Sequence, residues 1–315
     1  MWSRYRANLA HKLSFGREPR RGTRRPIEVA LDWPFLGTEA LARGVVNRYQ
    51  LRTRYDAVFR NVYVPKGQAL TAADKAIAAW LWSGRRATVS GLSAAALLGT
   101  RWIDANRPAE LNQASQHKTK GIVLHSDQLS DDESCLIRGI TVTSPARTAF
   151  DLGRRRGLTT AIIRLDALRQ STRVKPTDVE MVAERHRGAR GTTQLRTALA
   201  LSDAGAESPQ ETRTRLLLTS AGLRPQRTQI EIFDKFGGFV HRTDMGWDDW
   251  LVAVEYDGIQ HWADPGVRTN DIDWQAEAED LGWRVVRVSA DMLRYRQATI
   301  VRRTRMALRA AGAPF

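Results

Sequence analysis

The chain has 315 residues, a length that favours two globular units over one. Hydrophobic residues make up 42% and charged residues 26%, which excludes a chain that is disordered throughout. No apolar run approaches the roughly 20 residues that span a bilayer, and no signal-peptide core precedes the first domain. We therefore expect a cytoplasmic protein that does not contact a membrane.

The charge of the chain points to a polyanionic partner. Its formal net charge is +15, and residues 1–206 hold 34 of the 49 basic residues but 18 of the 34 acidic ones. Nucleic acid, with duplex DNA first, is the partner that such a balance favours. The alternatives are an ordinary solvated basic surface, or a structural or RNA-associated basic protein.

The single cysteine limits the metal chemistry that the chain can support. Cys135 has no partner for an internal disulfide, and no Cys/His cluster has the spacing of a zinc site. Any metal is therefore expected to have oxygen ligands.

The first elements are expected to be a basic arm and a small DNA-binding unit. Residues 1–25 hold eight basic residues and few apolar ones, which predicts a disordered arm or the product of an upstream start codon. Residues 33–66 predict a winged helix, with helices at Thr38–Ala42 and Asn47–Tyr55 and a strand at Phe59–Val64. The second helix would place Arg48, Arg52 and Arg54 in the major groove. The alternative is a helical hairpin with a solvated basic face.

Residues 67–200 predict a mixed α/β domain. Apolar spacing predicts a helix over Thr71–Trp82, and SGLSAAALLG a second one. Short strands are expected at Ala109–Asn112, Ile122–His125 and Ile140–Val142. The segment TSPARTAFDLGRR then opens a series of helices that continues to about Ala200, and residues 201–207 read as a linker.

This first part of the chain resembles the AbiEi-family antitoxins. The resemblance rests on FRNVYVP, GLSAAALLG, GIVLHSDQLSDDE and VTSPARTAFDLG, and covers roughly residues 33–200. It implies a winged helix joined to a mixed α/β domain that binds DNA, as a repressor does. It does not imply that a toxin partner exists.

Residues 208–315 predict a second α/β domain. Ser208 caps a helix with Pro209 in its first turn and Glu211 in capping-box position. A hairpin that turns at Gly237 and Gly238 follows, with a return strand over Val240–Asp244. The next strand, WLVAVEYDG, is apolar enough for a central position in its sheet. The last helix, Thr299–Ala311, carries arginines that we read as solvated, with DNA contact as the less favoured reading.

Strand alternation brings two carboxylates together in this domain. Glu255 and Asp257 share one face of the strand, opposite Val254 and Tyr256. Such adjacent charges are unfavourable unless a cation neutralises them, and Asp244 can supply a third oxygen ligand. Mg²⁺ is typically held by carboxylates and water in this way. The alternative is that both acids face solvent at the end of the strand.

The C-terminal part resembles the very-short-patch-repair endonuclease-like branch of the PD-(D/E)xK superfamily. The resemblance covers about residues 207–311 and rests on the helix with Glu211, the strand with Asp244, the segment EYDGIQH and the segment GWRVVRVSADML. It implies a restriction-endonuclease-like α/β/α domain that hydrolyses DNA with Mg²⁺ or Mn²⁺. Asp244 and Glu255 would bind the metal, and His261 would donate a proton or contact phosphate. The candidate catalytic residues are thus Glu211, Asp244, Glu255, Asp257 and His261, with Asp257 as a further metal ligand.

One position departs from the superfamily pattern. Asp257 stands where the motif has its lysine, so the usual positive charge beside the attacking water is missing. A second ion bound by Asp257, or the side chains of His261, Gln260 or Arg284, would have to replace it. Arg284 and Arg287 are also candidate phosphate contacts, although both would equally suit the solvent face of a half-buried strand.

Taken together, the sequence predicts a multi-domain α/β protein. The favoured function is a DNA-binding protein with a Mg²⁺-dependent endonuclease domain. The alternative is a non-enzymatic, antitoxin-like transcriptional regulator that carries a degenerate nuclease fold.

Overall fold

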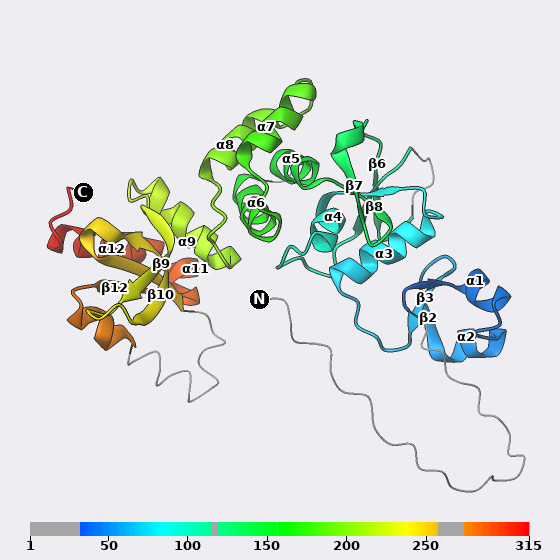
Figure 1. Cartoon of the computed structure of the whole chain (residues 1–315), viewed down its shortest axis with the longest axis horizontal. Helices are drawn as coiled ribbons and strands as arrows, with labels where there is room; N and C mark the ends of the chain where they lie inside the picture. Colours follow the sequence, from blue (N-terminus) through cyan, green and yellow to red (C-terminus); the bar gives the residue numbers. More distant parts are fainter. Residues whose placement is uncertain (1–31, 115–118, 156, 258–273, 315) are drawn as a thin grey trace, which may run out of the picture. The chain divides into compact units, whose positions relative to one another are not determined.

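The computed structural model describes residues 32–114, 119–155, 157–257 and 274–314 (Figure 1). Trp33–Phe315 form one compact unit of mixed α/β structure, with three sheets among the described residues. The predicted basic arm over residues 1–25 lies outside them. None of the helices in the described ranges is both long and apolar enough to cross a bilayer.

The first sheet is small and antiparallel, with the order β1-β3-β2. Its strands are β1 (Phe35–Leu36), β2 (Tyr55–Phe59) and β3 (Val62–Pro65). Two helices, α1 (Gly37–Ala42) and α2 (Arg48–Arg54), lie between β1 and β2 in the chain. Helix α2 begins after Asn47, whose side chain accepts from the Gln50 N–H while the Gln50 side chain accepts from the Asn47 N–H.

The single strand predicted over Phe59–Val64 is wrong. The chain reverses there, with Asn61 at a φ of +64°, and forms the β2–β3 hairpin. Asparagine tolerates this left-handed conformation better than most residues, so a tight turn is possible without glycine.

The second sheet has the order β6-β5-β4-β8-β7. Its strands are β4 (Thr88–Val89), β5 (Ala109–Asn112), β6 (Ile122–His125), β7 (Ser134–Ile137) and β8 (Ile140–Thr143), and helices α3 (Ala72–Trp82) and α4 (Gly91–Leu97) pack against it. The three predicted strands and both predicted helices are therefore confirmed, and Thr71 caps α3 in a capping box with Asp74. Strands β4 and β7 were not predicted.

Four helices follow and share one apolar core. They are α5 (Pro145–Arg155), α6 (Leu158–Thr172), α7 (Pro176–Arg185) and α8 (Thr192–Leu201), which confirms the helical series expected up to about Ala200. Leu152, Leu165 and Leu195 lie in the centre of this core and are almost fully buried.

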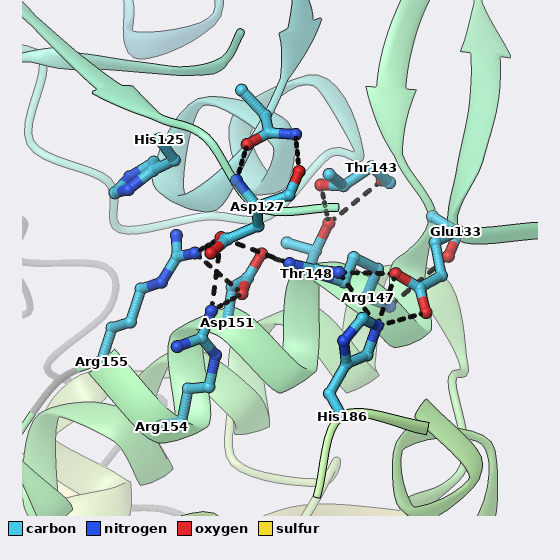
Figure 2. A network of polar contacts seen from close by, with 12 residues as sticks. His125, Asp127, Glu133, Thr143, Arg147, Thr148, Asp151, Arg154, Arg155 and His186 are labelled. Carbon is cyan, nitrogen blue, oxygen red and sulfur yellow. Dashed lines mark hydrogen bonds and ion pairs between the residues drawn. The ribbon is translucent and has the colours of Figure 1, made fainter. Parts of the chain in front are cut away.

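A buried polar network centred on Arg147 holds this helical region to the second sheet (Figure 2). The Arg147 guanidinium contacts Glu133 Oε2 at 2.5 Å and Asp151 Oδ2 at 3.1 Å, and its side chain is only 1% exposed. His186, which follows α7, contacts Glu133 Oε1 at 2.8 Å. Asp127 is contacted by Arg154 and Arg155, as well as by Arg147. The polar residues of TSPARTAFDLG therefore form ion pairs and hydrogen bonds inside the protein.

The third sheet has the order β12-β11-β10-β9. Its region consists of α9 (Pro209–Ser220), β9 (Arg227–Phe233), β10 (Phe239–Trp247), β11 (Val252–Asp257), a helix over residues 274–280, β12 (Arg284–Ser289), α11 (Ala290–Tyr295) and α12 (Gln297–Ala310). Strands β9, β10 and β11 are antiparallel, whereas β12 runs parallel to β11. Strand β11 is interior, as its apolar sequence predicts.

Helices cover both faces of this sheet (Figure 1). Val254 and Val286 pack with apolar residues of α9, α11 and α12 on one face. On the other face, Val285 packs with Trp274 and Ala278 of the helix over residues 274–280. The alternating side chains of β11 and β12 thus form two separate apolar layers, and the acids of β11 lie in its C-terminal half.

Asp166 joins α6 to the start of the C-terminal region. This aspartate is 1% exposed and accepts from the Asp203 N–H, the Thr212 hydroxyl and Arg215 Nη2, at 2.7, 2.9 and 2.8 Å. Burial raises the pKa of Asp166, and the Arg215 charge opposes that rise. The segment that composition marks as a linker is therefore fixed by hydrogen bonds to a helix on its N-terminal side.

Candidate active site

The candidate active site lies where β10 and β11 cease to pair. The regular register ends at Met245 and Val254, and side chains take over the next hydrogen bonds. The Asp244 N–H donates to Glu255 Oε2 at 3.1 Å, and the Tyr256 N–H donates to Asp244 Oδ2 at 2.6 Å. Each carboxylate thus binds the backbone of the opposite strand, and the two acids lie beside each other.

Like charges and burial together make Asp244 the most perturbed acid at this site. Burial, followed by the negative charges of Glu255 and Glu211, raises the pKa of Asp244 from 3.8 to about 9, against the stabilising Tyr256 N–H. Burial likewise raises the pKa of Glu211, with added repulsion from Glu207 and Glu255. The negative charge of Glu255 thus contributes to the raised pKa of both Asp244 and Glu211, which groups these three predicted catalytic acids.

Glu211 reaches this site from the first turn of α9. Its N–H donates to the Ser208 hydroxyl at 3.2 Å, so Ser208 caps the helix as predicted. The reciprocal half of the predicted capping box is wrong, because Glu211 Oε2 accepts from the Glu207 N–H at 2.8 Å instead. Gln229 on β9 also donates to Glu211 Oε2, at 3.3 Å, which turns the carboxylate toward the sheet.

Asp257 lies on the same strand but has a different partner. Its Oδ2 is 3.0 Å from Arg287 Nη2, and the Arg287 guanidinium also lies over the Trp274 ring, 5.8 Å from the ring centroid. The structure therefore gives Asp257 a counter-charge from β12. Arg284 lies beside Val252, at the opposite end of β11 from Asp257, and is exposed.

His241 on β10 is a site residue that sequence reasoning missed. Its Nε2 lies 3.3 Å from Glu255 Oε1, and its ring stacks on Trp274 with centroids 3.7 Å apart and planes 10° apart. Simple alternation places His241 and Asp244 on opposite faces of a strand, so the sequence offers no signal that joins them. The predicted His261 and Gln260 lie outside the described residues.

The donor chemistry of the site suits a hard cation, but its geometry is incomplete for one. Carboxylate oxygens of Glu211, Asp244 and Glu255 are the ligand type that Mg²⁺ and Mn²⁺ prefer, and a cation would relieve the repulsion that raises the Asp244 pKa. Within the ranges that the structure describes, no three His, Cys, Asp or Glu side chains stand ready to ligate one metal ion. The acids therefore fit a metal by chemistry, and would need side-chain rotation to hold it.

The predicted DNA-contacting arginines lie on the open side of α2. Arg48, Arg52 and Arg54 are all exposed, whereas Leu51 is buried against the small sheet. Tyr49 is 69% exposed on the same helix. The surface of α2 thus combines positive charge with an aromatic ring.

Comparison with known proteins identifies relatives, but their names state no function. No protein-family model matches the chain. Two uncharacterized proteins of Mycobacterium tuberculosis, from strains CDC 1551 / Oshkosh and ATCC 25618 / H37Rv, are each 32% identical to it over 158 residues. The match covers 50% of this chain and 58% of each relative, so the chain spans a little over half the length of the curated relatives it matches. The similarity therefore brings no function with it.

Proposed function

We propose that this protein binds duplex DNA and hydrolyses its phosphodiester bonds at the acidic site of the third sheet, with Mg²⁺ or Mn²⁺ as cofactor. The observation that carries the proposal is the group of Glu211, Asp244 and Glu255, in which burial and like charge raise the pKa of Asp244 to about 9. Strongly perturbed acids grouped at the ends of two strands are typical of functional sites. Their mutual repulsion destabilises the fold, so such a group indicates a function that compensates for this cost.

The order of elements around these acids supports a restriction-endonuclease-like domain. A helix with Glu211, an antiparallel hairpin and the strand with Glu255 are followed by a helix and a parallel strand. This is the order that the resemblance to the PD-(D/E)xK superfamily implies. A covering of helices on both faces agrees with the α/β/α arrangement expected there.

The first three strands and two helices support a winged-helix reader. Helix α2 follows α1 after a short connection and is followed by the β2–β3 hairpin. Its exposed Arg48, Arg52 and Arg54 would contact phosphates or guanine edges in the major groove. This unit would hold the protein on DNA.

Asp244 and Glu255 are the residues that would hold the metal ion, with Glu211 completing the acidic group. When bound, the ion would orient and acidify a water molecule and neutralise charge on the scissile phosphate. His241, fixed by its stacking on Trp274, orients the Glu255 carboxylate through the 3.3 Å contact. Arg287 compensates the charge of Asp257, which limits the negative charge that an approaching phosphate meets.

A cleavage assay tests the proposal. Supercoiled plasmid, mismatched duplex and single-stranded DNA are incubated with the full chain in Mg²⁺, Mn²⁺ or chelator. We expect cleavage that needs the metal and disappears in Asp244→Asn and Glu255→Gln. Asp249→Asn and Glu231→Gln are the matched controls, because both acids are exposed and lie in the same region. Cleavage that survives chelator or the two site substitutions would contradict the proposal.

A second candidate is a non-enzymatic DNA-binding regulator. Two observations favour it: Asp257 occupies the position of the superfamily lysine, and no three potential ligands among the described residues are poised for a metal. On this reading, the full chain would bind DNA without cutting any substrate, and divalent ions would leave its melting temperature unchanged. Under the enzymatic reading the ions should raise that temperature, because a ligand of the native state stabilises it.

A further inference from the structure

The last two helices concentrate the positive charge of an otherwise neutral region. Residues 207–315 hold 15 basic and 16 acidic residues, yet between residues 290 and 314 Asp291 is the sole acid. The same stretch contains six arginines and no lysine: Arg294, Arg296, Arg302, Arg303, Arg305 and Arg309. The choice of arginine matters, because its planar guanidinium forms paired hydrogen bonds to phosphate.

Most of these arginines lack the acidic partners that other arginines of the region have. Arg227, Arg242 and Arg287 pair with Asp248, Glu207 and Asp257 at 2.5, 2.9 and 3.0 Å. Across the described ranges, by contrast, no ion pair involves Arg294, Arg296, Arg302, Arg303 or Arg305. Their positive charge is thus not neutralised within the described part of the chain.

Part of this charge lines two hollows along α9, the first between α9, α6 and α11 and the second between α9 and α12. Two hollows, of about 800 and 650 Å³, adjoin each other because Leu217 and Gln297 line both. Arg213 and Arg294 line the first hollow. The second is lined on α12 by Arg302, Arg305 and Arg309. We call these two hollows the α9–α12 groove.

We propose that the α9–α12 groove binds the sugar–phosphate backbone of DNA. Arg302, Arg305 and Arg309 follow one stripe of α12 and span about 10 Å of helix, which is the rise of about three phosphates of one strand. Leu217 and Val301 also line this hollow, so the arginines flank an apolar strip. Charge complementarity therefore selects a polyanion with regularly spaced charges.

The groove also leads toward the acidic site, and in this respect the inference rests on the proposed function. The first hollow reaches the end of β11 on the α9 face, where Tyr256 lines it; the side chains of Glu255 and Asp257 lie on the opposite face of that strand. A strand held by the arginines would pass around the end of β11 to reach the carboxylates. The arginines would then offset the repulsion that the acids exert on phosphate.

The test compares two pairs of substitutions with equal charge change in the full chain. Arg294→Gln with Arg302→Gln removes groove arginines, whereas Arg296→Gln with Arg303→Gln removes exposed arginines of the same helices that do not line the groove. DNA affinity is measured against salt concentration in chelator, so that no cleavage intervenes. We expect the groove pair to reduce the slope of log K against log salt by about 2, and the control pair by less than half as much.

The outcomes separate this inference from the proposed function. Equal slopes for the two pairs, or an unchanged slope for the groove pair, would overturn the groove as a binding surface. A groove pair that loses affinity for RNA but not for DNA would overturn the assignment of DNA. Because binding is read in chelator, a wild-type protein that cuts no DNA would refute the nuclease proposal and leave the groove result intact.

Discussion

Asp257 Oδ2 lies 3.0 Å from Arg287 Nη2, so the acid that stands where the resemblance to the PD-(D/E)xK superfamily implies a lysine is neutralised by an arginine of the neighbouring parallel strand. A lysine at 257 would meet this arginine and be repelled by it. Asp257→Lys combined with Arg287→Gln should therefore restore a single cation beside Glu255. We expect metal-dependent cleavage to rise about a hundredfold, the lower end of what one preorganised donor contributes, in initial rates of plasmid nicking. The control is Asp257→Asn with Arg287→Gln, and a rate equal to that control would argue against a lost catalytic lysine.

The raised pKa of Asp244 predicts a stability that falls with pH. Because its pKa is about 9 in the folded protein and 3.8 ordinarily, the folded state holds a proton that the unfolded state releases between these values. The contribution of Asp244 to the free energy of unfolding is complete below about pH 4 and is lost as pH rises toward 9. Asp244→Asn removes this dependence and keeps the acceptor for the Tyr256 N–H. Without metal, we expect the variant to be about 1–3 kcal/mol more stable at pH 8 by urea unfolding, and to gain little at pH 4.

Asp249→Asn is the control for this measurement, since Asp249 is exposed and lies a few residues further along the chain. It should follow the wild-type pH profile. A profile for Asp244→Asn that parallels the wild type from pH 4 to 9 would show that Asp244 is charged in the fold at neutral pH.

The network in Figure 2 predicts a large stability loss from one substitution. Arg147→Met leaves Glu133 and Asp151 buried without their main counter-charge, at 0% and 2% exposure. We expect a loss of about 3–5 kcal/mol in the free energy of unfolding, measured by denaturant titration. Arg227→Met, which breaks the pair between the exposed Arg227 and Asp248, should change it little. Similar losses in the free energy of unfolding for both variants would show that burial of the Arg147 network does not cause the loss.

The exposed face of α2 predicts a binding loss without unfolding. Arg48→Ala with Arg52→Ala should weaken duplex DNA binding by about 1–3 kcal/mol for each residue that contacts a base. The circular dichroism spectrum should not change, because both side chains are exposed. Arg43→Ala, an exposed arginine just after α1, is the control. Unchanged affinity in the double variant would remove α2 as the reading helix.

The sequence predicts those elements whose signals are local. The helix over Thr71–Trp82, the cap at Ser208 and the apolar interior strand β11 follow from a few adjacent residues, and all are present. The hairpin turn at Gly237 is equally local, with a φ of +83° and Asp234 accepting from the Phe236 and Gly238 N–H groups. At the Ser208 cap and at the hairpin turn, one short segment contains both the donor and the acceptor.

The remaining features depend on partners that are distant in sequence. Strand β4 has two residues, too few for an alternating pattern, and exists because β5 and β8 flank it. Alternation correctly puts Glu255 and Asp257 on one face, but the register with β12 decides that Arg287 meets Asp257. His241 joins the site through Glu255 and Trp274, which lie 14 and 33 positions further along the chain. Sequence patterns fix faces, whereas contacts across strands need the assembled sheet.

The hydrogen bonds of Asp166 bear on how this protein would respond to a protease. Residues 202–208 have the small and polar composition at which proteases often cut between domains. Here the Asp203 N–H is held by Asp166, Ala206 is buried, and the Glu207 carbonyl accepts from Trp102 Nε1. Cutting requires the backbone to open locally, so the free energy of breaking these contacts is added to the barrier. Limited digestion with proteinase K, which needs no basic residue at the cut, should therefore spare this segment in the wild type and nick it in Asp166→Ala.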